Sequence, residues 1–115
     1  MARSHKPIIW SLFAAGGTFA AFFTPVMIVI TGLAISVGLL PADTLAYDRV
    51  LTLVHNPVAK IGIFIAIFLP TWHAAHRLRI TAHDFGVRAD IPVATLCYTA
   101  AAVLTAVTVW VLVGV

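Results

Sequence analysis

Charge is scarce in this sequence. Only 10% of its 115 residues are charged, whereas 62% are hydrophobic, and the mean hydropathy is +1.06. A soluble domain of this length would need far more charge to cover its surface. Uncharged runs reach the roughly 20 residues that cross a bilayer as a helix. The scarcity of charge therefore predicts an all-α integral membrane protein.

Other absences narrow the function. The single cysteine, Cys97, lies in an apolar run, so it forms no internal disulfide and is interpreted as a small packing residue. The net charge of +3 is spread over short segments, and no polar domain carries the basic face that nucleic-acid binding needs. The sequence pairs no nucleophile with a base and has no cofactor-binding loop. We therefore expect no nucleic-acid partner and no catalytic activity from this chain alone.

The first uncharged run, residues 7–42, is longer than one straight transmembrane helix requires. As a helix, its 36 residues would reach about 54 Å, against a hydrocarbon core of about 30 Å. The run also exceeds the short apolar core of a cleaved signal peptide, so we expect it to be retained. We expect two features to accommodate its length: a flexible point at Gly16 and Gly17, and a lost helix hydrogen bond at Pro25.

Polar residues mark the expected helix boundaries. Asp43 is predicted to cap a short amphipathic helix, and Asn56 and Pro57 to end it and start the next span. Asp90 is predicted to cap the last span. The expected segments are an interfacial lead-in at residues 8–17, transmembrane spans at about 18–40, 58–77 and 91–115, and a surface helix at 43–55.

The distribution of Lys and Arg predicts the orientation, because cytoplasmic segments carry the excess of positive charge. The N-terminal tail and the second loop together hold five of these residues: Arg3, Lys6, Arg77, Arg79 and Arg88. The first loop holds two, Arg49 and Lys60. We therefore predict a cytoplasmic N-terminus and a periplasmic C-terminus, with Trp10 and residues 70–85 on the same side.

Small residues recur at four-residue spacing in the expected third span: Thr95 and Thr99, Ala101 and Thr105, and Ala102 and Ala106. Such faces let membrane helices approach closely. The alternative, that Ala and Thr are simply common in membrane helices, stays open. In either case, three helices without a polar domain indicate one part of a larger assembly.

Residues 70–85 gather titratable groups directly after an uncharged run. In a helix, residues three and four apart share a face. One stripe consists of Trp72, His76, Arg79 and His83, and the neighbouring stripe of His73, Arg77 and Asp84. We expect the helix to end before His83, so the register beyond Arg79 stays open.

Four interpretations of these groups remain open. His73 and His76 could share a metal ion, although no carboxylate or cysteine joins them on the helix. A haem would need a second axial histidine from a partner. A quinone would find hydrogen-bond donors, a proton carrier, and aromatic walls at Trp10, Phe13 and Trp72. Spacing alone favours the fourth, in which the arginines and histidines only hold the helix at the membrane interface.

Four segments in this order carry a resemblance to a known family: WSLFAAGG, TPVMIVITG, LLPADTLAYDRVL and LPTWHAAHRLRITAHDF. Over nearly its whole length the sequence resembles the D subunit, the smaller hydrophobic anchor, of enterobacterial-type quinol:fumarate reductases. The resemblance implies a complex with a flavoprotein, an iron–sulfur subunit and a second anchor, C, on the bacterial inner membrane. It also implies a menaquinol-oxidising pocket shared between subunits, in an anchor without haem, for anaerobic respiration.

The resemblance also implies which side chains meet the quinone. Carried onto this sequence, these positions are Trp10, Phe13, His76 and Arg77. Ala14 stands where the family can carry glycine, which leaves the shape of the pocket wall open. His73 and Arg79 stand where variable residues are expected, so neither inherits a role.

Two other functions remain as alternatives. One is the anchor of a succinate dehydrogenase, which would have the same architecture and would bind haem b. The other is a small accessory membrane protein that binds no quinone. A visible absorption spectrum of the purified complex tests the first alternative, because haem b gives sharp bands. Co-purification with flavin and iron–sulfur subunits would exclude the second.

Overall fold

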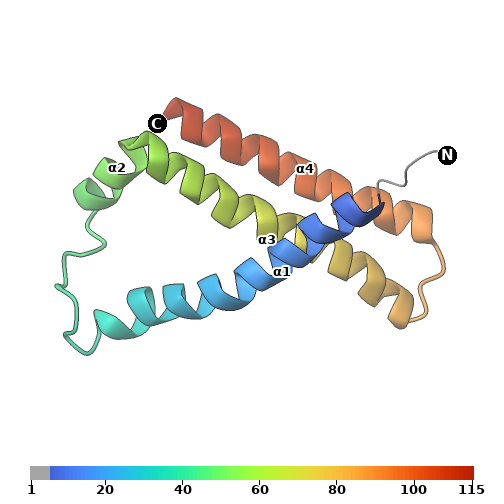
Figure 1. The fold of residues 1–115 in the computed structure, drawn as a ribbon, viewed down its shortest axis with the longest axis horizontal. Coiled ribbons are helices and arrows are strands. Elements are labelled where there is room, and N and C mark those ends of the chain that lie inside the picture. The colour runs from blue at the N-terminus through green and yellow to red at the C-terminus, as the bar shows by residue number, and fades with distance from the viewer. Residues whose placement is uncertain (1–5) are drawn as a thin grey trace.

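The computed structural model describes residues 6–115, and almost all of these residues are helical (Figure 1). In chain order the elements are α1 (Lys6–Ile28), the π-helical turn η1 (Val29–Ala34), α2 (Tyr47–His55), α3 (Pro57–Asp84) and α4 (Asp90–Gly114). No strand occurs among the described residues. Three helical segments are long and apolar enough to cross a membrane: Lys6–Ala34, Pro57–Asp84 and Asp90–Gly114. The predicted all-α fold with three spanning helices is confirmed.

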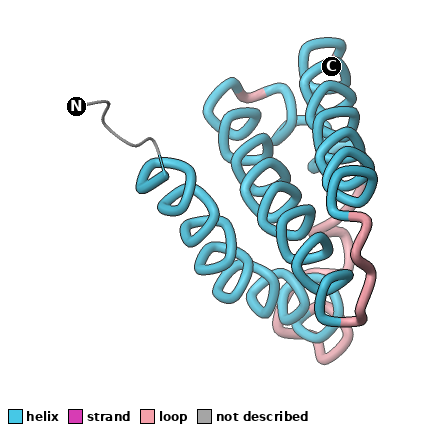
Figure 2. Tube along the Cα trace, turned by 90° about the vertical axis from the view of Figure 1, so that its right-hand side faces the viewer, coloured by secondary structure: helices cyan, strands magenta, loops and turns pink. Residues whose placement is uncertain are grey.

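Helix α3 lies between α1 and α4 and packs against both (Figures 1 and 2). Helix α4 runs back along α3, whereas α1 crosses it obliquely, in a molecule measuring 54 × 30 × 27 Å. The start of α1, the end of α3 and the start of α4 lie at one end. Helix α2 and the C-terminus lie at the other (Figure 1).

This arrangement brings the start of α1 to the same end as residues 70–85, as the charge count predicted (Figure 1). Arg3, which contributed to that count, lies outside the described residues. Which end faces the cytoplasm stays a prediction.

Very few of the apolar side chains in the described residues are buried. Only Ala34, Ala75 and Ala101 are buried hydrophobic residues, with exposed fractions of 7%, 5% and 2%. Large aliphatic and aromatic side chains are exposed along all three long helices. A chain with so small a core places its apolar surface against lipid or against other membrane helices.

The expected flexible point at Gly16 and Gly17 is wrong, because α1 runs through both glycines without a break. Gly16 is buried where α1 crosses α3. A Cβ atom at this position would collide with the Leu69 carbonyl oxygen and would lie 3.0 Å from the His73 Cβ. A Cβ atom on Gly17 would lie 2.5 Å from Cε1 of the His73 ring. The two glycines therefore permit a close helix crossing and provide no hinge.

The distortion of the first span falls after Pro25. Helix α1 continues past Pro25 to Ile28, and the next six residues form the π-helical turn. In that turn the Thr31 hydroxyl donates a 2.7 Å hydrogen bond to the Met27 carbonyl. The resulting helical segment, Lys6–Ala34, includes the predicted lead-in and most of the predicted first span without separating them. Where along it the bilayer begins stays a prediction.

Asp43 does not cap the surface helix, contrary to prediction. Helix α2 begins at Tyr47, and its N-cap residue is Ala46, which has no capping side chain. The Asp43 carbonyl instead accepts a 2.9 Å bond from the Ala46 N–H. Its carboxylate pairs with Arg49 at 2.7 Å, and both side chains are exposed. Asp43 therefore lies in a turn before α2, and its carboxylate reaches Arg49 in the first turn of that helix.

The predicted boundary at Asn56 and Pro57 is confirmed. The Asn56 Oδ1 accepts hydrogen bonds from the N–H groups of Val58 and Ala59, at 2.9 and 3.3 Å. Pro57 occupies the first helical position, where its missing N–H costs nothing. Side-chain capping and the proline together start α3 at this residue.

Helix α3 continues to Asp84, so the expectation that it ends before His83 is wrong. Gly86 has φ +84° and ends the helix in a left-handed conformation. The Gly86 N–H bonds the His83 carbonyl at 2.9 Å, and the Val87 N–H bonds the Ala82 carbonyl at 3.0 Å. These two bonds form a Schellman motif. The helical register therefore holds through the whole segment of titratable groups.

Candidate functional site

The stripe of α3 that begins with Trp72 and His76 faces α4. The Trp72 indole N–H donates to the Thr105 hydroxyl at 3.1 Å, and that hydroxyl donates to the Ala101 carbonyl at 2.8 Å. One turn further along α3, His76 Nδ1 lies 2.8 Å from the Tyr98 hydroxyl oxygen. The rings of Trp72 and Tyr98 are stacked, with centroids 6.2 Å apart. Each polar group on this stripe therefore has a partner on α4.

The stripe continues into a charged cluster at the turn between α3 and α4. Arg79 binds the Asp90 carboxylate through two nitrogens, at 2.8 Å from Nε and 2.6 Å from Nη2. His83 Nε2 lies 3.1 Å from the same carboxylate. The prediction that Asp90 caps α4 is wrong: the N-cap residue is Ala89, which has no capping side chain, and Asp90 begins the helix. The Asp90 carboxylate binds Arg79 because the Schellman motif and the short loop after it place the start of α4 beside the end of α3.

His73 faces the opposite way, toward α1. Its Nδ1 lies 3.0 Å from the Phe13 carbonyl oxygen, and because a carbonyl only accepts, the imidazole donates from Nδ1. The rings of His73 and Phe13 stack with centroids 4.4 Å apart. The same Phe13 ring meets His76 edge-on at 4.6 Å. His73 therefore ties α1 to α3 and holds Phe13 beside His76.

An apolar hollow of about 190 Å³ opens where these three helices meet, and we call it the aromatic hollow. Its lining residues are Ile9, Trp10, Leu12, Phe13, Leu69, Trp72, His76 and Tyr98. Three of the four predicted quinone-binding residues, Trp10, Phe13 and His76, therefore share one site. Trp10 and Phe13 lie in α1, whereas His76 lies in α3, more than 60 positions later in the chain.

Arg77, the fourth predicted residue, does not line the aromatic hollow. Successive residues of a helix point about 100° apart, so the side chain after His76 leaves on another face. Arg77 is exposed, and no hydrogen bond or ion pair joins its guanidinium to another residue in the described part of the chain. It is available to a group outside this chain at the same depth as His76.

Tyr98 was not predicted from the sequence. The one feature of the sequence that could have indicated it is a tyrosine, a ring with a hydroxyl group, within an otherwise apolar, uncharged span. Nothing in the sequence connects it with His76, which lies 22 positions earlier.

The aromatic hollow fits a flat ring with polar edges better than it fits a metal ion. No group of three or more potential metal ligands gathers anywhere in residues 6–115. The walls are aromatic or aliphatic, and the polar groups are those of His76, Tyr98 and the Trp10 indole, since the Trp72 N–H is already bonded to Thr105. Pockets that enclose small molecules usually measure about 300–1,000 Å³. The smaller volume and a Trp10 that is 68% exposed show that this chain alone encloses the hollow only in part.

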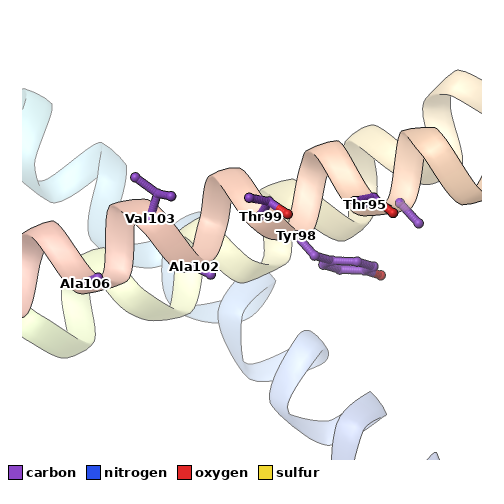
Figure 3. A pocket seen from close by; sticks show the side chains of 7 residues that line it. Thr95, Tyr98, Thr99, Ala102, Val103 and Ala106 are labelled. Atoms are coloured by element: carbon purple, nitrogen blue, oxygen red, sulfur yellow. The ribbon is translucent and has the colours of Figure 1, made fainter.

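The predicted small-residue faces of α4 divide between two sides. Ala101 and Thr105 turn to α3, where Ala101 is buried and Thr105 bonds Trp72. The outer side carries a shallow groove lined by Ala94, Thr95, Tyr98, Thr99, Ala102, Val103 and Ala106 (Figure 3). Tyr98 therefore borders both this groove and the aromatic hollow.

An apolar bundle of three spanning helices, with an incomplete aromatic hollow at one end, defines a small multi-pass membrane protein that works within an assembly. Residues 1–113 match the family model of the D subunit of fumarate reductase. The chain belongs to this family, and it is a membrane anchor subunit of fumarate reductase whose partners are the other subunits of that complex.

Several relatives are similar over most of their length. The fumarate reductase D subunit of Vibrio vulnificus (strain YJ016) is 36% identical over 93% of this chain and 86% of that protein. The D subunit of Photobacterium profundum is also 36% identical, over 93% of this chain and 89% of that protein. The D subunit of Shewanella sp. (strain W3-18-1) is 35% identical, over 96% of this chain and 92% of that protein.

Proposed function

We propose that this chain holds the flavoprotein and iron–sulfur subunits of a fumarate reductase on the bacterial inner membrane, together with the C anchor. We further propose that it forms part of the site at which menaquinol is oxidised. The family membership supports the anchoring role. The observation that carries the second role is the meeting of Trp10, Phe13 and His76 in one aromatic hollow that is open at the surface of this chain.

The residues of this chain suit positioning and proton handling. Oxidation of a quinol releases two electrons and two protons. The sequence of this chain has no cofactor-binding loop, and we expect no haem here. The electrons therefore pass to the iron–sulfur subunit. An imidazole nitrogen that carries a lone pair accepts a proton, which makes His76 the proton-accepting group. A guanidinium does not release its proton, so Arg77 acts by charge and hydrogen bonding.

Removing the chain tests the anchoring role. We expect the flavoprotein and iron–sulfur subunits to leave the membrane fraction while they still reduce fumarate with an artificial dye as electron donor. Dye-linked activity lost together with membrane binding would show that the chain does more than anchor. Subunits that stay on the membrane without it would contradict the proposal.

Substitutions at His76 and Arg77 test the site. Loss of a hydrogen bond to a charged group typically costs about 1.5–3 kcal/mol, which is roughly a ten- to hundredfold effect. His76→Ala and Arg77→Leu should each lower quinol-dependent fumarate reduction by that factor and leave the dye-dependent rate unchanged. His55→Ala is the matched control, because His55 lies in α2 at the other end of the molecule (Figure 1). Full quinol-linked turnover in assembled His76 and Arg77 variants would leave those residues as interfacial anchors only.

A further inference from the structure

Two hydroxyl groups of α4 bond side chains of α3: Thr105 bonds Trp72, and Tyr98 bonds His76. The hydroxyl oxygen of Tyr98 lies 2.8 Å from His76 Nδ1. In the described part of the chain no hydrogen bond is made by the other ring nitrogen, Nε2, although His76 lines the aromatic hollow. The hydroxyl thus occupies one nitrogen of the ring and leaves the other for a ligand in the hollow.

From this geometry we infer that Tyr98 is a positioning residue of the quinol site, which acts by orienting His76 and by stabilising the imidazole before and after proton uptake. The inference rests on the proposed quinol-oxidising function. Its basis is the contact between Tyr98 and His76, together with the way in which the surrounding residues hold both rings in place.

Three contacts restrain the pair. Tyr98 stacks on Trp72, whose indole N–H is itself bonded to Thr105. Phe13 meets the His76 ring edge-on from α1. One turn beyond His76, the two-point contact from Arg79 closes α3 onto the start of α4. A bidentate guanidinium–carboxylate pair sets orientation as well as distance. The hydroxyl and the imidazole therefore meet in one defined geometry.

A phenol hydroxyl suits this position because it either donates or accepts a hydrogen bond. While the ring is neutral with its hydrogen on Nε2, the Tyr98 O–H donates to Nδ1. With the hydrogen on Nδ1, the Tyr98 oxygen accepts from it, and Nε2 has a free lone pair toward the hollow. After proton uptake the imidazolium donates from Nδ1 to the same oxygen. Phenylalanine offers neither role, although it fills the same volume.

The step balances with groups that the complex supplies. His76 Nε2 takes the hydrogen of a quinol hydroxyl as a proton, so an N–H bond forms and the O–H bond breaks. The electron pair of that bond stays on the quinol oxygen. The oxidant is the iron–sulfur centre of the partner subunit, which accepts the two electrons as the ring is oxidised, and the second hydroxyl of the quinol releases its proton to water. Tyr98 accepts the hydrogen bond from Nδ1 before and after this step, and it neither gains nor loses a proton.

Tyr98→Phe in the assembled complex is the first test. A neutral hydrogen bond is worth about 0.5–1.5 kcal/mol, so we expect quinol-dependent kcat to fall about two- to tenfold. The aromatic wall persists, so KM and the dissociation constant of a fluorescent hydroxyquinoline N-oxide, a quinol analogue, should stay within about twofold. Tyr47→Phe is the matched control, because Tyr47 is the other tyrosine, 76% exposed in α2 at the opposite end. Tyr98→Leu, which also removes the wall, should raise KM and weaken analogue binding.

A double-mutant cycle with His76→Ala distinguishes positioning from a separate role. If Tyr98 acts through His76, adding Tyr98→Phe to His76→Ala should lower kcat no further. An equal fall in both backgrounds would overturn the inference, as would a Tyr98→Phe variant with raised KM and unchanged kcat. A normal Tyr98→Phe rate beside an impaired His76→Ala rate would overturn this inference and leave the proposed site standing. Normal rates in both variants would remove the proposed site itself.

Discussion

Replacement of Gly16 by alanine tests the helix crossing that builds the aromatic hollow. The new Cβ would collide with the Leu69 carbonyl oxygen and would lie 3.1 Å from the Leu69 carbonyl carbon and 3.0 Å from the His73 Cβ. Two of these atoms belong to the α3 backbone, which cannot rotate away as a side chain can. Helix α1 must therefore withdraw from α3, and overpacking of this kind typically costs about 1–3 kcal/mol.

The withdrawal should also impair the aromatic hollow. Phe13 lies one turn before Gly16 on α1, and its carbonyl bonds His73 at 3.0 Å across the same crossing. A shift of a few tenths of an ångström weakens that bond and moves the Phe13 ring from His76. Gly16→Ala should therefore lower both the thermal stability of the detergent-solubilised complex and its quinol-dependent activity. Dye-dependent activity, which does not use the hollow, should stay unchanged.

Gly62→Ala is the matched control for this substitution. Gly62 lies in α3, and apart from its own turn of the helix no atom lies within 4 Å of the position that its Cβ would take. Alanine there should be neutral or stabilising, since glycine costs a helix about 0.5–1 kcal/mol relative to alanine. Gly17→Ala should fall between the two, because the atoms nearest to its Cβ belong to the His73 ring, a side chain that can move. A Gly16→Ala complex as stable as the Gly62→Ala complex would refute the tight crossing.

Two further predictions concern the ends of the helices. A reporter fused after Val115 should read periplasmic, because Arg77, Arg79 and Arg88 favour retention of the second loop in the cytoplasm; a cytoplasmic reading would overturn the orientation. Arg79→Asp and Asp90→Arg should each lower the thermal stability of the complex, because each places like charges where the bidentate pair now ties α3 to α4. The double exchange should recover part of the loss, and no recovery would show that the pair contributes little.

Local sequence was sufficient for the spans and for one helix boundary. A run of about 20 uncharged residues can satisfy its backbone in a bilayer only as a helix, so three such runs predict three spanning helices. Asn56 and Pro57 act on their immediate neighbours, and their effect on the start of α3 followed from chemistry alone. The stripe through Trp72 and His76 followed from the helical period, which needs no knowledge of other helices.

Boundaries that depend on a distant group were predicted wrongly. Aspartate is a residue type that commonly caps helices, but the Asp90 carboxylate binds Arg79, which lies 11 positions earlier in the chain. Two adjacent glycines are typical of a flexible point in a helix, but Gly16 and Gly17 lie against Leu69 and His73. In each case a local preference worth about 1 kcal/mol yields to a tertiary contact.

The sequence by itself determined that this chain is a three-span membrane anchor and which residues of α3 share a face. Only the tertiary structure decided that this face meets Tyr98, that His73 turns to Phe13, and that Arg77 lies outside the aromatic hollow. The physical reason is the membrane environment. A soluble helix shows its buried side by an apolar stripe, whereas these helices are apolar all round, so their pattern does not distinguish lipid from a neighbouring helix.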